Sequence, residues 1–253
     1  MKQDKVTGLH AVESLLRKNP DQIDRLFIKQ GRTDRRLQKI IDLAKQKNIS
    51  AELVDAKTLD HEADGLRHQG VLAFCQPTKV KHENDLWQLL ETLKEPAFLL
   101  VLDGITDPHN LGACLRTADA VGVQAVIIPK DKSVGLTPVV RKVASGAAET
   151  VPLFQVTNLA RTLDTLKDMG VWLTGTSDKA GRTLYETDLT GSVALIVGAE
   201  GKGLRRLTEE RCDYLVSIPM AGSVSSLNVS VATGVCLYEA LRQRMLKESL
   251  INS

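Results

Sequence analysis

The feature that most constrains the fold is a series of apolar, β-rich segments in the second half of the chain. They occupy residues 98–104, 124–129, 171–177, 192–200 and 214–220. Segments with helical spacing or composition lie between and after them, at 111–121, 136–147, 158–169, 203–211 and 228–247. Continuous apolar strands are typical of parallel sheets whose two faces are covered by helices. The alternation therefore predicts an α/β domain with a mostly parallel sheet.

The first part of the chain has a shorter α/β pattern. Helix-like segments at 8–18 and 34–47 alternate with strand-like segments at 24–29, 51–54 and 70–75. A polar stretch interrupted by Pro77 follows, and then a leucine-rich helix that Pro96 closes. We predict a small α/β domain over 1–76, a linker over 77–96 and a second domain over 97–253.

Composition and charge exclude few functions. The chain has 253 residues, a net charge of +2 and 43% hydrophobic residues, which are values of an ordinary globular protein. The mild charge neither requires nor excludes a nucleic-acid partner. Aromatic residues make up only 4%, which argues against an RNA binder that relies mainly on base stacking. The four cysteines form no C-x-x-C pair and the five histidines have no metal-ligand spacing, so no metal site is predicted.

The expected location is the cytoplasm. The first residues lack the apolar core of a signal peptide, and no stretch reaches the ~18 uninterrupted apolar residues of a membrane span. Dispersed cysteines are typical of a reducing compartment. We therefore expect a soluble cytoplasmic protein with no membrane partner.

Ligands of α/β proteins bind beyond the carboxyl ends of the strands, and three segments in such places carry polar residues or glycines. The first is DGITDPHNLGACLRTADAVG, residues 103–122, in which a polar turn leads into a helix that carries Arg116. A purely structural alternative is that Asn110 only caps this helix and that Arg116 pairs with Asp119.

The second segment is GAEGKGLR, residues 198–205, whose glycines let the backbone approach a ligand closely. It matches neither the P-loop nor the G-x-G-x-x-G pattern, so its alternative is a plain turn in which Glu200 is a capping carboxylate. The third segment, residues 218–240, has small and polar residues before Asn228, which opens a helix. Here the alternative is a serine-rich loop with Asn228 as the helix cap.

Taken together and in this order, the three segments resemble the three motifs of the SpoU branch of the SPOUT RNA methyltransferases. The resemblance covers the whole C-terminal domain, and the first domain looks like the family's L30e-like RNA-binding domain. The wording IPMAGSVSSLNVSVATG is most similar to the bacterial members that methylate a guanosine ribose in 23S rRNA, in the P loop of the peptidyl-transferase centre.

The resemblance implies a fold, a cofactor and a partner. It implies a C-terminal trefoil knot, S-adenosylmethionine as the methyl donor, no metal, and a homodimer whose active site forms at the interface. The implied catalytic residues are Asn110, Arg116, Glu200, Ser226 and Asn228. The implied donor-binding residues are Thr174, Gly175, Thr176, Gly198, Ile218, Met220 and Leu227.

The chemistry suggests roles for some of these side chains. A guanidinium group is effectively always protonated, so we expect Arg116 to hold an RNA phosphate and stabilise the developing alkoxide rather than to act as a base. We expect the two asparagines to fix the loops and the hydroxyl, and Glu200 to position Arg116 or a loop backbone.

The first domain has a local group of cations, and we predict that RNA phosphates bind to Arg32, Arg35, Arg36 and Lys39. Its alternative is a solvated helix face. Two other functions stay open at this point. One is a tRNA 2′-O-methyltransferase of the same family, and the other is a non-catalytic RNA-binding ribosome-assembly factor, which would not need the complete catalytic set.

Overall fold

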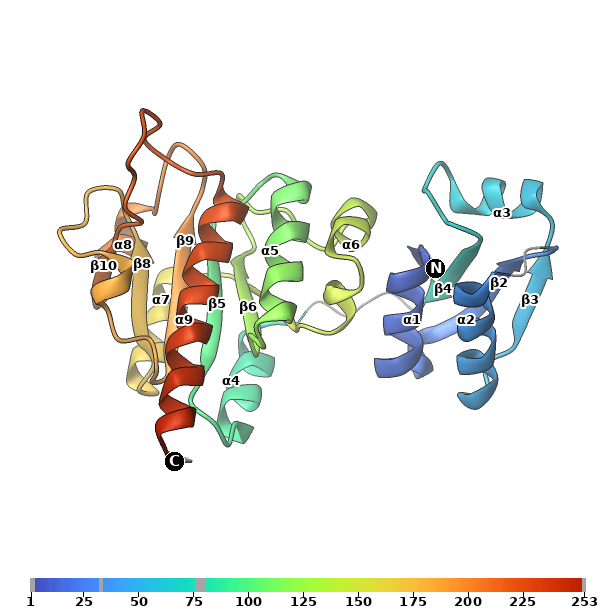
Figure 1. Ribbon diagram of the computed structural model, residues 1–253, viewed down its shortest axis with the longest axis horizontal. Coiled ribbons are helices and arrows are strands. Elements are labelled where there is room, and N and C mark those ends of the chain that lie inside the picture. Colours follow the sequence, from blue (N-terminus) through green and yellow to red (C-terminus); the bar gives the residue numbers. More distant parts are fainter. Residues whose placement is uncertain (1–2, 32–33, 76–80, 252–253) are drawn as a thin grey trace. The chain divides into compact units, whose positions relative to one another are not determined.

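The computed structural model describes residues 3–31, 34–75 and 81–251. The chain divides into two compact units (Figure 1). Unit 1 comprises residues 1–79 and 136–150, and unit 2 comprises residues 80–135 and 151–253.

Unit 1 contains a four-stranded sheet in the order β1-β4-β2-β3. Its strands are β1 (Asp4–Thr7), β2 (Ile23–Lys29), β3 (Ala51–Val54) and β4 (Val71–Cys75). Strand β4 runs antiparallel to both of its neighbours, and β2 and β3 are parallel. The helices of the first segment are α1 (Leu9–Lys18), α2 (Arg35–Gln46) and α3 (Ala56–Ala63), with a 3-10 turn η1 (Pro20–Gln22).

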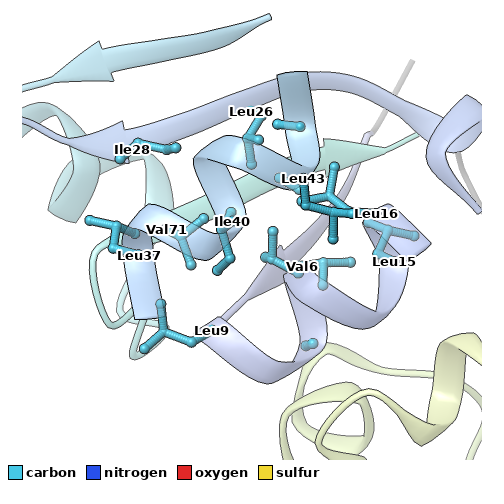
Figure 2. Close-up of a cluster of buried hydrophobic side chains, with 14 of the residues drawn as sticks. Val6, Leu9, Leu15, Leu16, Leu26, Ile28, Leu37, Ile40, Leu43 and Val71 are labelled. Atoms are coloured by element: carbon cyan, nitrogen blue, oxygen red, sulfur yellow. The ribbon is translucent and has the colours of Figure 1, made fainter. Parts of the chain in front are cut away.

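The core of unit 1 lies between the sheet and the pair α1 and α2. Figure 2 shows Leu15 of α1 and Ile40 of α2 in the same cluster as Leu26 of β2. Because successive strand residues point to opposite faces, Phe27 belongs to a second cluster, with Leu59 of α3. Helices therefore cover both faces of the sheet, and the predicted α/β character of this region is confirmed.

Residues 136–150 interrupt the sequence of unit 2 and group with unit 1. They form α6 (Pro138–Ala144) and the 3-10 turn η2 (Ala147–Glu149). Arg141 is buried there, ion-paired with Glu149 and, at 3.3 Å, with Asp4. The predicted second domain, 97–253, contains these residues, so the division into two units differs from the predicted domains. The domain bounds given above stay a prediction.

Unit 2 contains a six-stranded sheet in the order β10-β8-β9-β5-β6-β7, and every strand pair that the structure describes in it is parallel. Its strands are β5 (Phe98–Asp103), β6 (Ala125–Pro129), β7 (Leu153–Val156), β8 (Trp172–Thr176), β9 (Val193–Gly198) and β10 (Tyr214–Val216). The predicted fold class is confirmed. Strand β7 was not predicted, because it is short and lies at the sheet edge, where its burial alternates.

Helices cover both faces of this sheet as well. They are α4 (Glu83–Thr92), α5 (Pro108–Ala120), α7 (Leu159–Asp168), α8 (Arg206–Glu209) and α9 (Val229–Ile251), with a 3-10 turn η3 (Leu184–Glu186). Helices α4 and α7 share one apolar cluster with the sheet. On the other side, α9 lies along β9 and beside α5 (Figure 1). Helix α4 falls inside the predicted linker 77–96, of which residues 77–80 lie outside the described part.

Within the described residues, no helix combines the length and the apolar character that crossing a membrane requires.

Candidate active site

The three polar segments meet at the carboxyl ends of the central strands of unit 2. The side-chain amide of Asn228 donates to Asn110 Oδ1 at 3.1 Å and to Glu200 Oε2 at 3.4 Å. Asn110 lies in the first turn of α5, Glu200 in the loop after β9, and Asn228 directly before α9. Residues 118 and 28 positions apart in the sequence thus form one polar cluster.

The local structure separates the capping and site roles of the two asparagines. Helix α5 begins at Pro108, and Asp107 caps it by accepting a hydrogen bond from the His109 amide at 2.9 Å. The alternative that Asn110 is the cap is therefore wrong. Asn228 does cap its helix, since its Oδ1 accepts from the backbone amide of Ser230 at 2.9 Å. Its Nδ2 atom remains available to the polar cluster.

The glycines around Glu200 are required by the backbone. A Cβ atom on Gly198 would lie 2.1 Å from the carbonyl carbon of Gly203, so no larger residue fits there. Gly201 and Gly203 have φ values of +72° and +65°, in the left-handed region that favours glycine. The loop therefore folds back onto the end of β9, and Gly203 donates to the Ala199 carbonyl at 2.9 Å.

A pocket of about 380 Å³ opens beside this loop, within the usual size range of small-molecule sites. Its lining includes five of the seven predicted donor-binding residues, Thr176, Gly198, Ile218, Met220 and Leu227. Glu200 and Ser226 line it too. Apolar side chains next to closely approaching backbone fit an adenine ring, whose faces are apolar and whose edge forms hydrogen bonds. The residues present therefore suit an adenosyl group.

Thr174 and Gly175, the other two predicted donor-binding residues, lie deeper along β8 and are absent from the pocket lining. A Cβ atom on Gly175 would approach the Cys212 sulfur to 2.6 Å, so close packing under the loop accounts for this glycine. Thr174 is 1% exposed, and its hydroxyl has no hydrogen-bond partner among the described residues.

Arg116 stands apart from the polar cluster. It is exposed on α5, and its side chain makes no hydrogen bond or ion pair with any residue that the structure describes. Glu200 contacts Asn228 and not Arg116 within one subunit. No group of three metal-ligating side chains occurs in the described ranges.

The predicted RNA-binding cations of unit 1 do not form one group. Lys39 forms an ion pair with Glu13 at 2.7 Å, which lowers the pKa of that carboxyl group. Arg35 is exposed beside Lys39, and Arg32 lies outside the described residues.

Arg36 instead lines a hollow at one end of the sheet, together with Lys29 and Arg67. None of these three side chains has an ion-pair partner in the parts of the chain described here. Lys29 and Arg67 were missed by the sequence analysis, because no charge pattern connects residues that only the turn before β4 brings together.

The fold and the site define an α/β enzyme with a nucleoside-type pocket, and the chain belongs to the SpoU rRNA Methylase family. That family's model matches residues 97–238, and the model described as "RNA 2'-O ribose methyltransferase substrate binding" matches residues 5–80. The chain is 59% identical over 243 residues to the 23S rRNA (guanosine-2'-O-)-methyltransferase RlmB of Shewanella oneidensis, covering 96% of this chain and 98% of the relative.

Two solved structures are similar over nearly the whole chain. One is described as an RNA 2'-O ribose methyltransferase, with a TM-score of 0.77, 27% identity and coverage of 96% of this chain and 89% of the other. The other is the SpoU methyltransferase AviRb of Streptomyces viridochromogenes in complex with AdoMet. It has a TM-score of 0.79, 24% identity and coverage of 96% and 91%, and shows likeness of fold.

Proposed function

We propose that this protein transfers a methyl group from S-adenosylmethionine to the ribose 2′-hydroxyl of a guanosine in 23S rRNA, in the P loop of the peptidyl-transferase centre. The observation that carries the proposal is the contact of Asn228 with Asn110 and Glu200 beside the pocket. The name of the full-length relative from Shewanella oneidensis supports the rRNA guanosine as the substrate.

The residues of the pocket hold and orient the donor. Ile218, Met220 and Leu227 would offer apolar surface to the adenine, and the backbone at Gly198 would offer hydrogen-bonding groups to its edge. When bound, S-adenosylmethionine supplies a sulfonium methyl group that an oxygen nucleophile can attack. Orienting the two reactants can lower the barrier by about 7–11 kcal/mol in favourable cases, so positioning is the main task of the protein.

Asn110 and Asn228 hold the two loops against each other and orient the ribose hydroxyl through amide hydrogen bonds. Ser226, at the edge of the pocket, offers a further hydroxyl to the ribose or the donor. Arg116 binds a phosphate of the RNA and stabilises the negative charge that develops on the 2′-oxygen. The proton leaves through a phosphate oxygen or a water molecule.

The protein works as a homodimer, with α9 at the interface. Val231, Val235, Tyr238, Arg242 and Met245 follow the 3.5-residue spacing of a helix seam. Val231, Tyr238 and Met245 are 52%, 53% and 58% exposed, although the opposite face of α9 is buried against unit 2. Apart from Arg242, which pairs with Glu239, these residues form an exposed apolar stripe, and such a stripe marks a protein contact. Because the Arg116 side chain has no partner among the described residues of its own subunit, a second copy can bring it to the other subunit's polar cluster.

The trefoil knot is also part of the proposal. Strand β10 ends at the edge of the sheet, and α9 then returns to pack along β9 and α5. Such a return of the final segment to the middle of the sheet is the arrangement that a C-terminal knot needs.

Unit 1 binds RNA through the hollow lined by Lys29, Arg36 and Arg67. Three cations that have no ion-pair partner among the described residues lie around one concave surface, and they are suited to phosphate oxygens, whose negative charge they neutralise. Lys39 contributes less, since Glu13 already neutralises its charge. The work of this protein on ribosomal RNA takes place in the cytoplasm.

The experiment that tests the function uses purified protein and donor with a labelled methyl group. The protein and the donor are incubated separately with naked 23S rRNA, with ribosomal subunits and with tRNA, and the methylated position is mapped. We expect a 2′-O-methylguanosine in 23S rRNA. Methylated tRNA alone would favour the tRNA alternative, and RNA binding without methyl transfer would favour the non-catalytic assembly factor.

A further inference from the structure

Asp103 is the most deeply buried carboxylate at the site, and it belongs to neither the predicted catalytic set nor the pocket lining. It is the last residue of β5, and its side chain is 0% exposed. A carboxylate removed from water is tolerated only where ion pairs and hydrogen bonds replace its hydration. The partners of Asp103 therefore show which segment of the chain depends on it.

Arg205 supplies those partners. Its backbone amide donates to Asp103 Oδ2 at 3.0 Å, and its guanidinium group donates to Asp103 Oδ1 and forms an ion pair with it. One residue thus binds both oxygens of the carboxylate. Because one donor is a backbone amide, the contact fixes the course of the chain at residue 205 and not only the side chain.

This contact closes the loop that carries Glu200. Asp103 and Gly198 are register partners at the ends of the neighbouring strands β5 and β9. The loop leaves β9 at Gly198, turns through its left-handed glycines and returns to the end of β5 at Arg205. Residues 199–204 between these two anchors all line the pocket.

The same pair couples two of the three motif segments. Asp103 begins the turn that leads to Asn110, and Arg205 ends the loop that holds Glu200. We propose that Asp103 and Arg205 are a positioning pair that holds the 199–204 wall of the donor pocket and, through it, Glu200. Neither residue touches the reacting atoms. The inference deepens the proposed function and rests on it.

Arg205→Ala tests the pair, and Arg206→Ala is the matched control. Arg206 is the next residue. Its side chain is 77% exposed and forms its ion pair with Glu210, directly after α8, and not with Asp103. We expect Arg205→Ala to raise the KM for S-adenosylmethionine and the Kd for S-adenosylhomocysteine about tenfold or more, as the loss of a charged hydrogen bond predicts. The KM for RNA should stay within about twofold of the wild-type value, as should all constants of Arg206→Ala.

Arg205→Lys keeps the charge and the backbone amide but lacks the guanidinium fork, so its donor KM should lie between those of wild type and Arg205→Ala. Asp103→Asn combined with Arg205→Ala should weaken donor binding by less than the two separate effects added together, because both changes break one contact. A donor KM and Kd of Arg205→Ala within twofold of the Arg206→Ala values would overturn the inference, even if the thermal midpoint fell. A wild-type protein without donor binding or methyl transfer would instead overturn the proposed function.

Discussion

Asn228 Nδ2 lies 3.1 Å from Asn110 Oδ1, and this hydrogen bond joins the start of the last helix to the first turn of α5. The same asparagine caps α9 through its Oδ1 atom. The side-chain oxygen of Asn228 caps the helix and the side-chain nitrogen binds the polar cluster. A single isosteric change can therefore separate the stability of the helix from the chemistry of the site.

Asn228→Asp should leave the stability of the protein within about 0.5 kcal/mol of the wild type, because aspartate caps helices as well as asparagine does. It should lower the rate of methyl transfer about tenfold or more, because the change removes the amide donor and places a second carboxylate opposite Glu200. Urea unfolding and single-turnover kinetics measure the two effects. Asn228→Ala, which removes the cap as well, should lose about 1 kcal/mol of stability. Normal turnover of Asn228→Asp would contradict the role of this amide.

Arg116→Lys should lower kcat about 100-fold or more, because lysine cannot form the paired hydrogen bonds of a guanidinium group with phosphate or alkoxide. Binding of the donor, measured by calorimetry, should be unchanged. The Arg116 side chain lacks a partner in the part of the subunit that the structure describes, so its replacement should also leave the thermal midpoint unchanged. Near-normal turnover of the lysine variant would rule out the bidentate role that we assign to this side chain.

Replacement of Lys29, Arg36 and Arg67 by glutamine should weaken binding to a 23S rRNA fragment and reduce its salt dependence. The slope of log K against log salt concentration is negative, and each lost phosphate contact makes it shallower by about 0.7–0.9. For three contacts we expect a slope that is less negative by about 2 to 3. Filter binding at several salt concentrations measures it. The control is Lys57→Gln, an exposed lysine of α3 outside the hollow. Equal slopes for the triple variant and the control would remove the hollow from the RNA-binding surface.

Tyr238→Asp should convert the dimer to a monomer, since a carboxylate would be buried without a partner at the centre of the α9 stripe. Sedimentation should then report the chain mass of 27.6 kDa instead of twice that value. Leu53→Asp, at an exposed leucine of β3 in unit 1, is the control and should stay dimeric. A wild-type protein that is monomeric at micromolar concentration would refute the assembly directly.

The cysteine thiols should resist modification in the folded protein. Burial raises the pKa of Cys75, Cys212 and Cys236 to about 12 and that of Cys114 to about 11. Below these pKa values the thiol stays protonated, and the thiolate is the reactive form. At pH 8 a disulfide reagent should therefore label the native protein slowly, and labelling of all four thiols should become fast in denaturant. Rapid labelling of one thiol at pH 8 without denaturant would show that the burial of that residue is lost in solution.

Long periodic segments were predictable because their signal is local. The spacing of Leu37, Ile40 and Ala44 indicated α2, and the apolar run at 98–104 indicated β5, since burial of one helix face or of a whole strand is written into consecutive residues. Strands β1 and β7 were missed, and so was α3. These elements span only four to eight residues, so each shows too few repeats of its pattern to be recognised.

The residue types of the site were predictable as well, because polar turns after apolar strands are visible in the sequence. Their partners were not. The ion pair of Arg205 with Asp103 spans 102 positions, and the hollow that gathers Lys29 with Arg67 depends on the turn before β4. No local pattern distinguishes Arg205 from Arg206, yet Arg205 binds a buried carboxylate and Arg206 pairs with the exposed Glu210.

The sequence by itself determined the α/β class, the three polar segments and the resemblance that indicates methyl transfer. Only the tertiary structure decided that Asn110, Glu200 and Asn228 touch, that Glu200 faces an asparagine and not Arg116, and that Asp103 holds the glycine loop. The physical reason is that hydrophobic periodicity acts between near neighbours in the chain. Hydrogen bonds and ion pairs across a site depend instead on where distant strand ends and helix starts meet in space.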